Sequence, residues 1–185
     1  MKMPAILILA SLCSCAIEEP TYKFVRKEGN FEVRKYATIP IVSAPMQDME
    51  KRDDSFRTLF RYISGANEDK SKIAMTAPVF MENGAAADKT GRMSFMIPSQ
   101  VSEKGAPTPT AEDVAISKIG GGTFAVLRFK GWKDDTKREE ATGNLAKLIS
   151  EAALKPVGKP LYAFYDPPWT PEPLRRNEIW QRVEP

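Results

Sequence analysis

The stretch KIAMTAPVF (residues 72–80) alternates apolar residues with polar or small ones, as a β-strand with one buried face does. The apolar positions that would share the buried face are Ile73, Met75, Ala77, Val79 and Met81. Pro78 interrupts this pattern, because proline has no N–H to donate to a neighbouring strand. The pattern therefore predicts a strand whose apolar face lies in the core, with Pro78 at a sheet edge or a bulge.

Upstream of this stretch we expect a β-hairpin, a third strand and a helix. Alternation over residues 22–36, around a Glu-Gly-Asn turn at 28–30, indicates the hairpin. Residues 39–44 continue the strand pattern. The period then changes to that of a helix that stops near Gly65. The apolar stripe of this helix comprises Met49, Phe56, Leu59, Phe60 and Ile63.

Downstream the same plan repeats. A strand is predicted at RMSFMIP (residues 92–98), followed by a Pro- and Ser-rich surface connection. Further strands are predicted at 114–118, 123–130, 161–165 and 177–183. Between the second and third of these lies a second long helix, capped by Asp134 or Asp135. Its apolar face comprises Ala141, Leu145, Leu148, Ile149 and Ala152. This order predicts an α+β fold whose helices cover curved or barrel-like sheets.

The composition excludes several classes of site. The 185 residues contain no His, so the usual general base, the commonest metal ligand and the common proximal haem ligand are missing. Both cysteines, Cys13 and Cys15, lie near the N-terminus, which excludes zinc sites, Cys-His nucleophiles and a disulfide framework elsewhere. The net charge of +3 comes from interspersed signs without a basic stripe, so we expect no nucleic-acid partner.

The N-terminus has the features of a bacterial lipoprotein signal. The apolar run after Lys2 is shorter than the roughly 20 residues of a membrane-spanning helix. Leu12-Cys13-Ser14-Cys15 resembles a lipobox, in which Cys15 receives lipid and becomes the mature N-terminus. We therefore expect a signal peptide at 1–14, a tether at 15–21, and an outer-membrane anchor facing the periplasm. The alternatives are a plain signal peptide cut elsewhere, or an uncleaved buried segment.

Three segments carry a family resemblance. They are FEVRKY (31–36), LFRYISGAN followed by KIAMTAPV (59–79), and YDPPWTPEPLRRNEIW (165–180). Together they resemble the SOUL haem-binding family across nearly all of residues 22–183. The resemblance assigns residues 22–185 to one SOUL-like domain. It implies a duplicated α+β architecture, a distorted β-barrel flanked by two long helices. It also implies non-covalent binding of haem, another tetrapyrrole or a similarly flat apolar ligand.

The resemblance places the ligand near the first helix. The residues it implies for apolar contact are Phe56, Leu59, Ile63 and Met75. Arg57 and Arg61 would face the ligand's carboxylates, since guanidinium groups pair well with them. Trp169 is a candidate ring wall. Some family members are described with a His axial ligand, so this chain without His would bind haem in another way.

Each of these residues also has a purely structural interpretation. The apolar stripe suits a helix that packs on its own sheet, and Met75 suits a core. The two arginines suit a solvated face near Asp53 and Asp54. Trp169, held by Asp166-Pro167-Pro168, would then plug one end of the barrel.

The sequence thus predicts non-catalytic ligand binding in the cell envelope. One alternative is a scaffold or interaction module that no longer binds haem. The other is a small hydrolase, because the duplicated plan also resembles multidrug-sensing and gyrase-inhibitor-like domains. A buried carboxylate in an apolar cavity would favour that second alternative.

Overall fold

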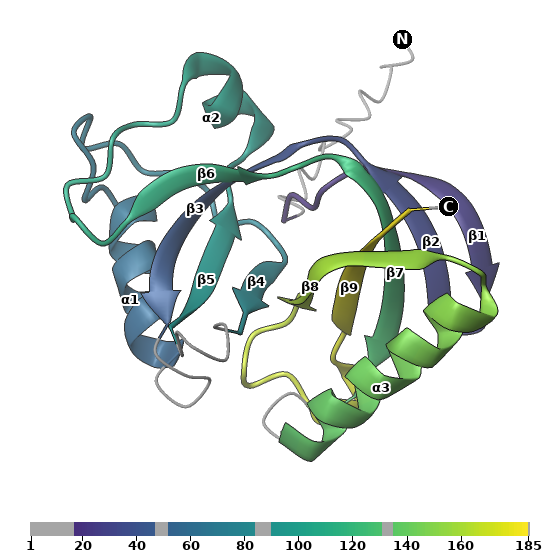
Figure 1. Cartoon of the computed structure of the whole chain (residues 1–185). Helices are drawn as coiled ribbons and strands as arrows, with labels where there is room; N and C mark the ends of the chain where they lie inside the picture. The colour runs from purple at the N-terminus through teal and green to yellow at the C-terminus, as the bar shows by residue number, and fades with distance from the viewer. Residues whose placement is uncertain (1–16, 47–51, 84–89, 131–134, 185) are drawn as a thin grey trace, which may run out of the picture.

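In the part of the chain that the structure describes, a single antiparallel sheet with nine strands forms the body of the protein (Figure 1). The computed structural model describes residues 17–46, 52–83, 90–130 and 135–184. Within these ranges the elements are β1 (Tyr22–Glu28), β2 (Phe31–Tyr36), β3 (Ile39–Met46), α1 (Arg52–Ile63), β4 (Val79–Glu82), β5 (Gly91–Met96), α2 (Ser99–Lys104), β6 (Ala115–Ile119), β7 (Gly122–Phe129), α3 (Asp135–Glu151), β8 (Lys155–Phe164), the 3-10 turn η1 (Glu172–Leu174) and β9 (Asn177–Glu184).

The strand order reveals an internal duplication. The sheet runs β1-β2-β7-β9-β8-β4-β5-β3-β6. Exchanging β2-β3-α1-β4-β5 with β6-β7-α3-β8-β9 returns the same order for strands β2 to β9, so the two units are related by a pseudo-two-fold. The first strand of each unit pairs with a strand of the other unit: β2 pairs with β7, and β6 pairs with β3. The predicted duplicated α+β architecture is confirmed.

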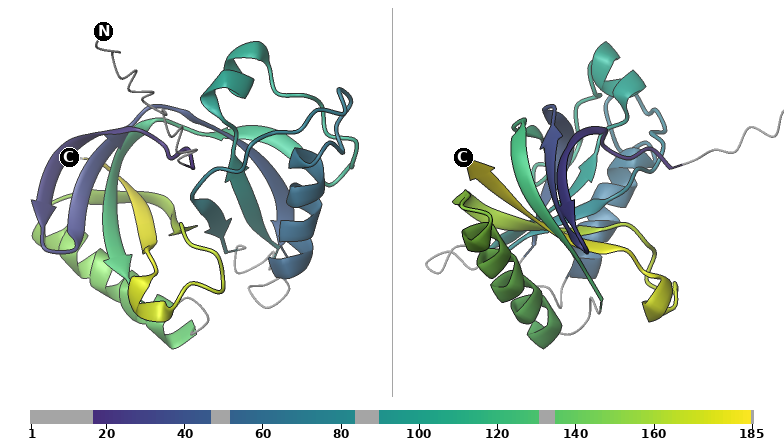
Figure 2. Two further views of the ribbon diagram at one scale, coloured as in Figure 1. Left: turned by 180° about the vertical axis from the view of Figure 1, so that it is seen from behind. Right: turned by 90° about the vertical axis from the view of Figure 1, so that its right-hand side faces the viewer.

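The sheet curves strongly but does not close. Strands β1 and β6 form its two edges. Figure 2 shows the two halves facing each other, with α1 on the outside of one and α3 on the outside of the other. The distorted barrel is therefore an open one. None of the described helices has the length and apolar character needed to cross a bilayer.

Apolar residues on both faces of the sheet are buried, and they form two cores. Between the sheet and its helices lies the larger core, which includes Phe31 and Val33 of β2. The smaller core fills the inside of the curve and contains Tyr36, Ile39, Ile41, Phe80, Met96, Phe124, Val126, Ala163 and Trp180. The predicted β1–β2 hairpin is confirmed, and Gly29 supplies the positive φ of 60° that its turn needs.

The buried face of α1 differs from the predicted apolar stripe. It consists of Ser55, Leu59, Tyr62 and Ile63, whereas Phe56 and Phe60 are exposed. Two polar groups are tolerated inside because each donates a hydrogen bond. Ser55 Oγ donates to the carbonyl of Pro45 at 2.7 Å, and Tyr62 Oη donates to that of Pro107 at 2.8 Å. Met49 lies outside the described residues.

The stretch at 72–80 is a strand only at its end. β4 begins at Val79, and Pro78 stands before it rather than within it. The preceding segment is held by isolated bonds, including Thr76 Oγ1 to the carbonyl of Met96 at 2.7 Å. Ile73 and Met81 still lie in the larger core, with Val79 packed against it, so the predicted buried face is confirmed although the predicted strand is too long.

The connection after β5 contains a helix that the sequence pattern did not predict. α2 spans Ser99–Lys104 and has no side-chain cap of its own. The carboxylate of Glu18 accepts a hydrogen bond from the Ser99 N–H at 2.9 Å, so a distant residue satisfies its first turn. The second long helix is confirmed as α3, with Ala141, Leu145 and Ile149 buried. Asp134 lies outside the described residues.

Candidate functional site

An aromatic ridge lies exposed on α1. Phe56 and Phe60 are one turn apart, and their rings stack with centroids 6.1 Å apart and planes 13° from parallel. Their side chains are 37% and 50% exposed. Phe56 is held from below by the edge of Phe95 on β5, at 5.2 Å between centroids. The helix therefore presents two nearly parallel, partly exposed aromatic rings.

Two arginines run beside this ridge. Arg57 lies three residues before Phe60 and four before Arg61, so it neighbours both on the helix surface. The nearest acid to Arg57 is Asp54, at 4.0 Å, and both side chains are exposed, which makes the pair weak. No ion pair of Arg61 occurs within the described ranges. Both guanidinium groups can therefore meet an anionic ligand.

Arg61 also borders a hollow on a side of α1 that does not include Phe56 or Phe60. The hollow has a volume of about 340 Å³ and lies between α1 and residues 109–114. Tyr62 and Asp113 contribute to its wall. Burial is the main reason that the pKa of Tyr62 is raised, with Asp69 adding to it. Arg61 lines this hollow, whereas Arg57 lies one turn before Phe60. Arg57 is therefore closer to the aromatic ridge than Arg61 is.

Three of the predicted apolar contacts do not belong to this surface. Leu59 is completely buried and Ile63 nearly so, both in the core between the sheet and the helices. Met75 is half-buried against the same core. Leu59 and Ile63 therefore offer no surface to a ligand, and the exposed apolar area of α1 comes from Phe56 and from Phe60. The pattern had placed Phe60 in the stripe without naming it as a contact.

Trp169 stands apart from α1. It lies on the connection between β8 and β9, whereas α1 packs on β3 and β5. Its side chain is 82% exposed, so the interpretation that it plugs the barrel is wrong. Trp180 takes that place. It is fully buried inside the curved sheet, stacks on Tyr36 with centroids 4.3 Å apart and meets the edge of Phe80 at 5.2 Å.

A completely buried carboxylate, Glu178 of β9, lies beside this aromatic cluster. The guanidinium of Arg34 donates two hydrogen bonds to it, of 2.9 and 3.1 Å. Four further side chains donate to it, namely Arg128, Tyr165, Arg176 and Trp180. Each carboxylate oxygen thus accepts three hydrogen bonds. This network was not predicted from the sequence, although alternation in FEVRKY and NEIW puts its members on one face of each strand.

The electrostatics of the network keep Glu178 ionised. Burial alone would raise its pKa, but the hydrogen bonds and charge of Arg34, helped by Arg176, lower it to about 2. Burial also dominates at Tyr165, whose pKa is raised. A general base works best with a pKa near the working pH. Glu178 is therefore suited to joining the neighbouring strands β2, β7 and β9 and not to proton transfer.

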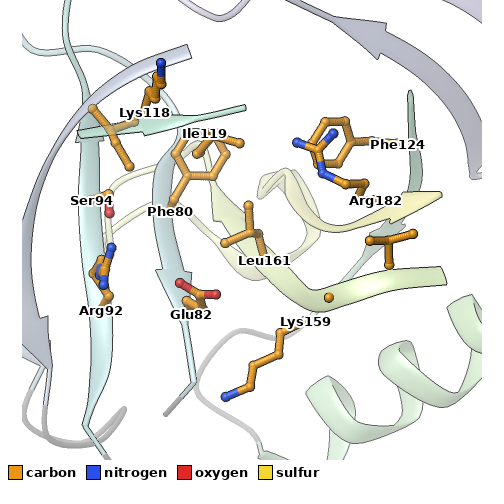
Figure 3. Close-up of a pocket in the computed structure, with 13 residues that line it drawn as sticks. Phe80, Glu82, Arg92, Ser94, Lys118, Ile119, Phe124, Lys159, Leu161 and Arg182 are labelled. Atoms are coloured by element: carbon orange, nitrogen blue, oxygen red, sulfur yellow. The ribbon is translucent and has the colours of Figure 1, made fainter. Parts of the chain in front are cut away.

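A cleft opens where the two halves of the sheet meet (Figure 3). Its volume is about 300 Å³, at the lower end of the roughly 300–1,000 Å³ usual for ligand pockets. Phe80 and Leu161 contribute apolar floor. At the rim, Glu82 and Arg92 are cross-strand partners and Lys159 lies opposite them. Enclosing a whole tetrapyrrole there would require the halves to separate.

Metal-binding side chains are sparse. In the parts of the chain that the structure describes, no three His, Cys, Asp or Glu residues gather where they could hold a metal ion. The chain has no His at all, and Cys13 and Cys15 lie outside the described residues. Chemically, the exposed face of α1 can hold a flat apolar ring with acidic substituents, through ring contacts and arginine pairing.

Comparison with known proteins agrees with this architecture. Residues 17–182 match the family of the SOUL heme-binding protein, a match that begins inside the expected tether. The chain is 32% identical to heme-binding protein 2 of Homo sapiens over 186 residues, covering 92% of this chain and 89% of that protein. It is 31% identical to heme-binding protein 2 of Mus musculus with the same coverage, and 24% identical to heme-binding protein 1 of Xenopus tropicalis, with 83% and 81% covered.

Solved structures share the fold at low sequence identity. The EcmrR C-terminal domain superposes with a TM-score of 0.65 at 13% identity, covering 88% of this chain and 98% of that one. A hydrolase from Listeria innocua superposes with a TM-score of 0.61 at 11% identity, covering 84% and 92%. These likenesses establish the fold alone. Sequence and architecture together show that the chain belongs to the SOUL heme-binding protein family.

Proposed function

We propose that the protein binds haem, a related tetrapyrrole or a similarly flat apolar ligand on the exposed face of α1, without catalysis. The observation that carries this proposal is the stacked pair Phe56 and Phe60 beside Arg57 and Arg61. Family membership supports the ligand class, because its relatives are named heme-binding proteins. The ring would lie on the aromatic ridge, with its propionates toward the arginines.

Two kinds of contact would hold the ligand. Ring burial contributes roughly 25 cal/mol per Å² of apolar area, before the cost of association is subtracted. A propionate paired with Arg57 adds about 1.5–3 kcal/mol if shielded from water, and much less if exposed. Arg57 neighbours the ridge more closely than Arg61 does, so it would make the stronger pair.

The residues near the ridge fit a ring held without a strong axial bond. Histidine is missing from the chain, and the thioether of Met75, a side chain that can ligate haem iron, is half-buried against the core. A bound haem would bring a redox-active iron to this surface. The chain's own part would be to bind the ring and to orient its acidic edge.

The same proposal places the protein in the cell envelope. Cys15 would carry lipid and anchor the chain, with the outer membrane as its destination and the periplasm as its compartment. The lipobox-like Leu12-Cys13-Ser14-Cys15, after a short apolar run, supports this. Mass spectrometry of the N-terminus tests the anchor independently of ligand binding.

A small hydrolase is less well supported. The buried carboxylate that would favour an enzyme is paired with three arginines and has a lowered pKa.

A titration of the full chain with haem, followed by absorbance, tests the proposal that the protein binds a tetrapyrrole. A saturable one-to-one change without the spectrum of His ligation supports it, and a spectrum identical to that of free haem supports a scaffold role.

A further inference from the structure

We propose that the connection between β8 and β9 is a second membrane contact, through which Trp169 and Leu174 enter the headgroup layer of the bilayer. The inference rests on the lipid anchor at Cys15 proposed above. It adds a fixed orientation: the domain would lie against the membrane on this side and expose α3 to the aqueous phase.

The first observation is the exposure of two large apolar side chains on one short connection. Trp169 is 82% exposed and Leu174 is 74% exposed. Tryptophan is enriched where proteins meet the membrane interface, because its ring is apolar and its N–H needs a polar partner. Neither side chain contributes to the two cores. Any burial of these two side chains would come from outside the described chain.

The second observation is that this connection is rigid. Arg175 donates to the carbonyls of Pro168 and Thr170, and Asp166 accepts from the Arg176 N–H. The 3-10 turn η1 closes it, with the Leu174 N–H bonded to the carbonyl of Pro171 at 2.9 Å. Lys130 and Lys137 tie it to the body through Pro173 and Glu172. A preformed apolar tip loses little conformational freedom on docking.

The third observation is a clamp between this connection and the N-terminal segment. Arg176 binds Glu19 at 2.8 Å with one nitrogen and Glu178 at 3.0 Å with another. Its guanidinium also lies 3.6 Å above the ring of Tyr165. The carbonyl of Glu18 also accepts a hydrogen bond from the Ala77 N–H at 2.9 Å. Residues 18 and 19, expected to belong to a tether, are thus bound to the body.

The clamp limits the distance between a lipid and the domain. Cys15 lies two residues before Ile17, so even a fully extended chain spans only about 7 Å between them. In the right-hand view of Figure 2 the first described residues and the η1 connection project toward one side, and α3 runs away from that side after its first turn, where Lys137 bonds to Glu172. A bilayer that holds Cys15 would therefore face Trp169 and Leu174.

The experiment measures whether lipid reaches Trp169. The full chain is placed in phosphatidylcholine vesicles whose acyl chains carry bromine, which quenches tryptophan emission on contact. Comparison of wild type with Trp169→Phe isolates this residue from Trp132 and Trp180. The difference between the wild-type and variant emission is the emission of Trp169. The brominated lipid should quench this difference by about half or more if the ring lies in the interface. Equal fractional quenching of the two proteins overturns the proposal.

A matched control tests the orientation. Lys147 is exposed on α3, ten residues beyond the Lys137 that contacts η1, so Lys147→Trp in the Trp169→Phe background puts an exposed tryptophan away from the connection. It should remain unquenched, and quenching equal to that of Trp169 would contradict a fixed orientation. If Cys15 carries no lipid, the chain is added to the same vesicles. Quenching of Trp169 then supports the surface without the anchor, and its absence overturns it.

Discussion

Arg34 and Glu178, 144 positions apart in the sequence, form a two-bonded ion pair with both side chains completely buried. Two of the motifs by which the sequence resembles its family, FEVRKY and YDPPWTPEPLRRNEIW, each contribute one partner. Their meeting ties β2 to β9 across the intervening strand β7. In this pair the motifs therefore hold one half of the curved sheet together rather than contact a ligand.

Neutralising Glu178 should destabilise the fold. Glu178→Gln leaves the guanidinium of Arg34 buried with a weakened partner, and breaking such a pair costs about 3–5 kcal/mol. Equilibrium unfolding in denaturant measures the loss. Glu184→Gln makes the same change at an exposed position of β9 and should cost less than about 0.5 kcal/mol. Equal effects of the two substitutions would contradict a structural role for the pair.

The free energy of unfolding should fall as the pH is lowered from about 4.5 toward 2. The pKa of Glu178 is lowered from 4.5 to about 2, so the folded state binds its proton less readily than the unfolded state does. The stabilisation is fully present above about pH 4.5 and is lost as the pH falls toward 2, by roughly 3 kcal/mol. The melting temperature as a function of pH measures it. In Glu178→Gln this fall should shrink but not vanish, because the pKa of Glu32 is also lowered.

Leu59 and Phe60 are adjacent in the sequence but should respond oppositely. Leu59 is fully buried, so Leu59→Ala should lower the free energy of unfolding by about 2–5 kcal/mol. Phe60→Ala should change it by only about 0.5 kcal/mol, yet it should weaken porphyrin binding severalfold. Denaturant unfolding and fluorescence titration give the two numbers. If Leu59→Ala unfolds at the same free energy as wild type but binds porphyrin more weakly, the ligand contacts the buried face of α1 and the account is wrong.

Lipidation can be tested at a single atom. Cys15→Ser removes the thiol that would receive the lipid, so the protein should leave the membrane fraction or accumulate as an uncleaved precursor. Mass spectrometry of the wild-type protein should find the lipid on Cys15 as the first residue. An unmodified N-terminus beyond residue 15 would refute the anchor and leave the ligand proposal intact.

Apolar periodicity predicted most strands and both long helices, and it failed where polar groups have specific partners. Ser55 and Tyr62 occupy the buried face of α1 because each finds a backbone carbonyl, which hydrophobicity cannot reveal. α2 was missed because its cap, Glu18, comes from a distant part of the sequence. The α1 arginines followed from the family resemblance. The exposed ridge beside them, and the pairing of Arg34 with Glu178, required the folded chain.

The central claim is that α1 binds a tetrapyrrole through ring contact and arginine pairing, and the affinity for metal-free protoporphyrin tests it most directly. Replacing Arg57 and Arg61 together with Ala should weaken binding about tenfold or more, with Arg57 contributing the larger share. Replacing Lys147 and Lys155, two exposed cations elsewhere, should leave it unchanged. The metal-free ring should bind the wild-type protein nearly as well as haem does, because no strong axial bond is expected. Unchanged affinity in the arginine variant, or a large preference for haem, would contradict the account.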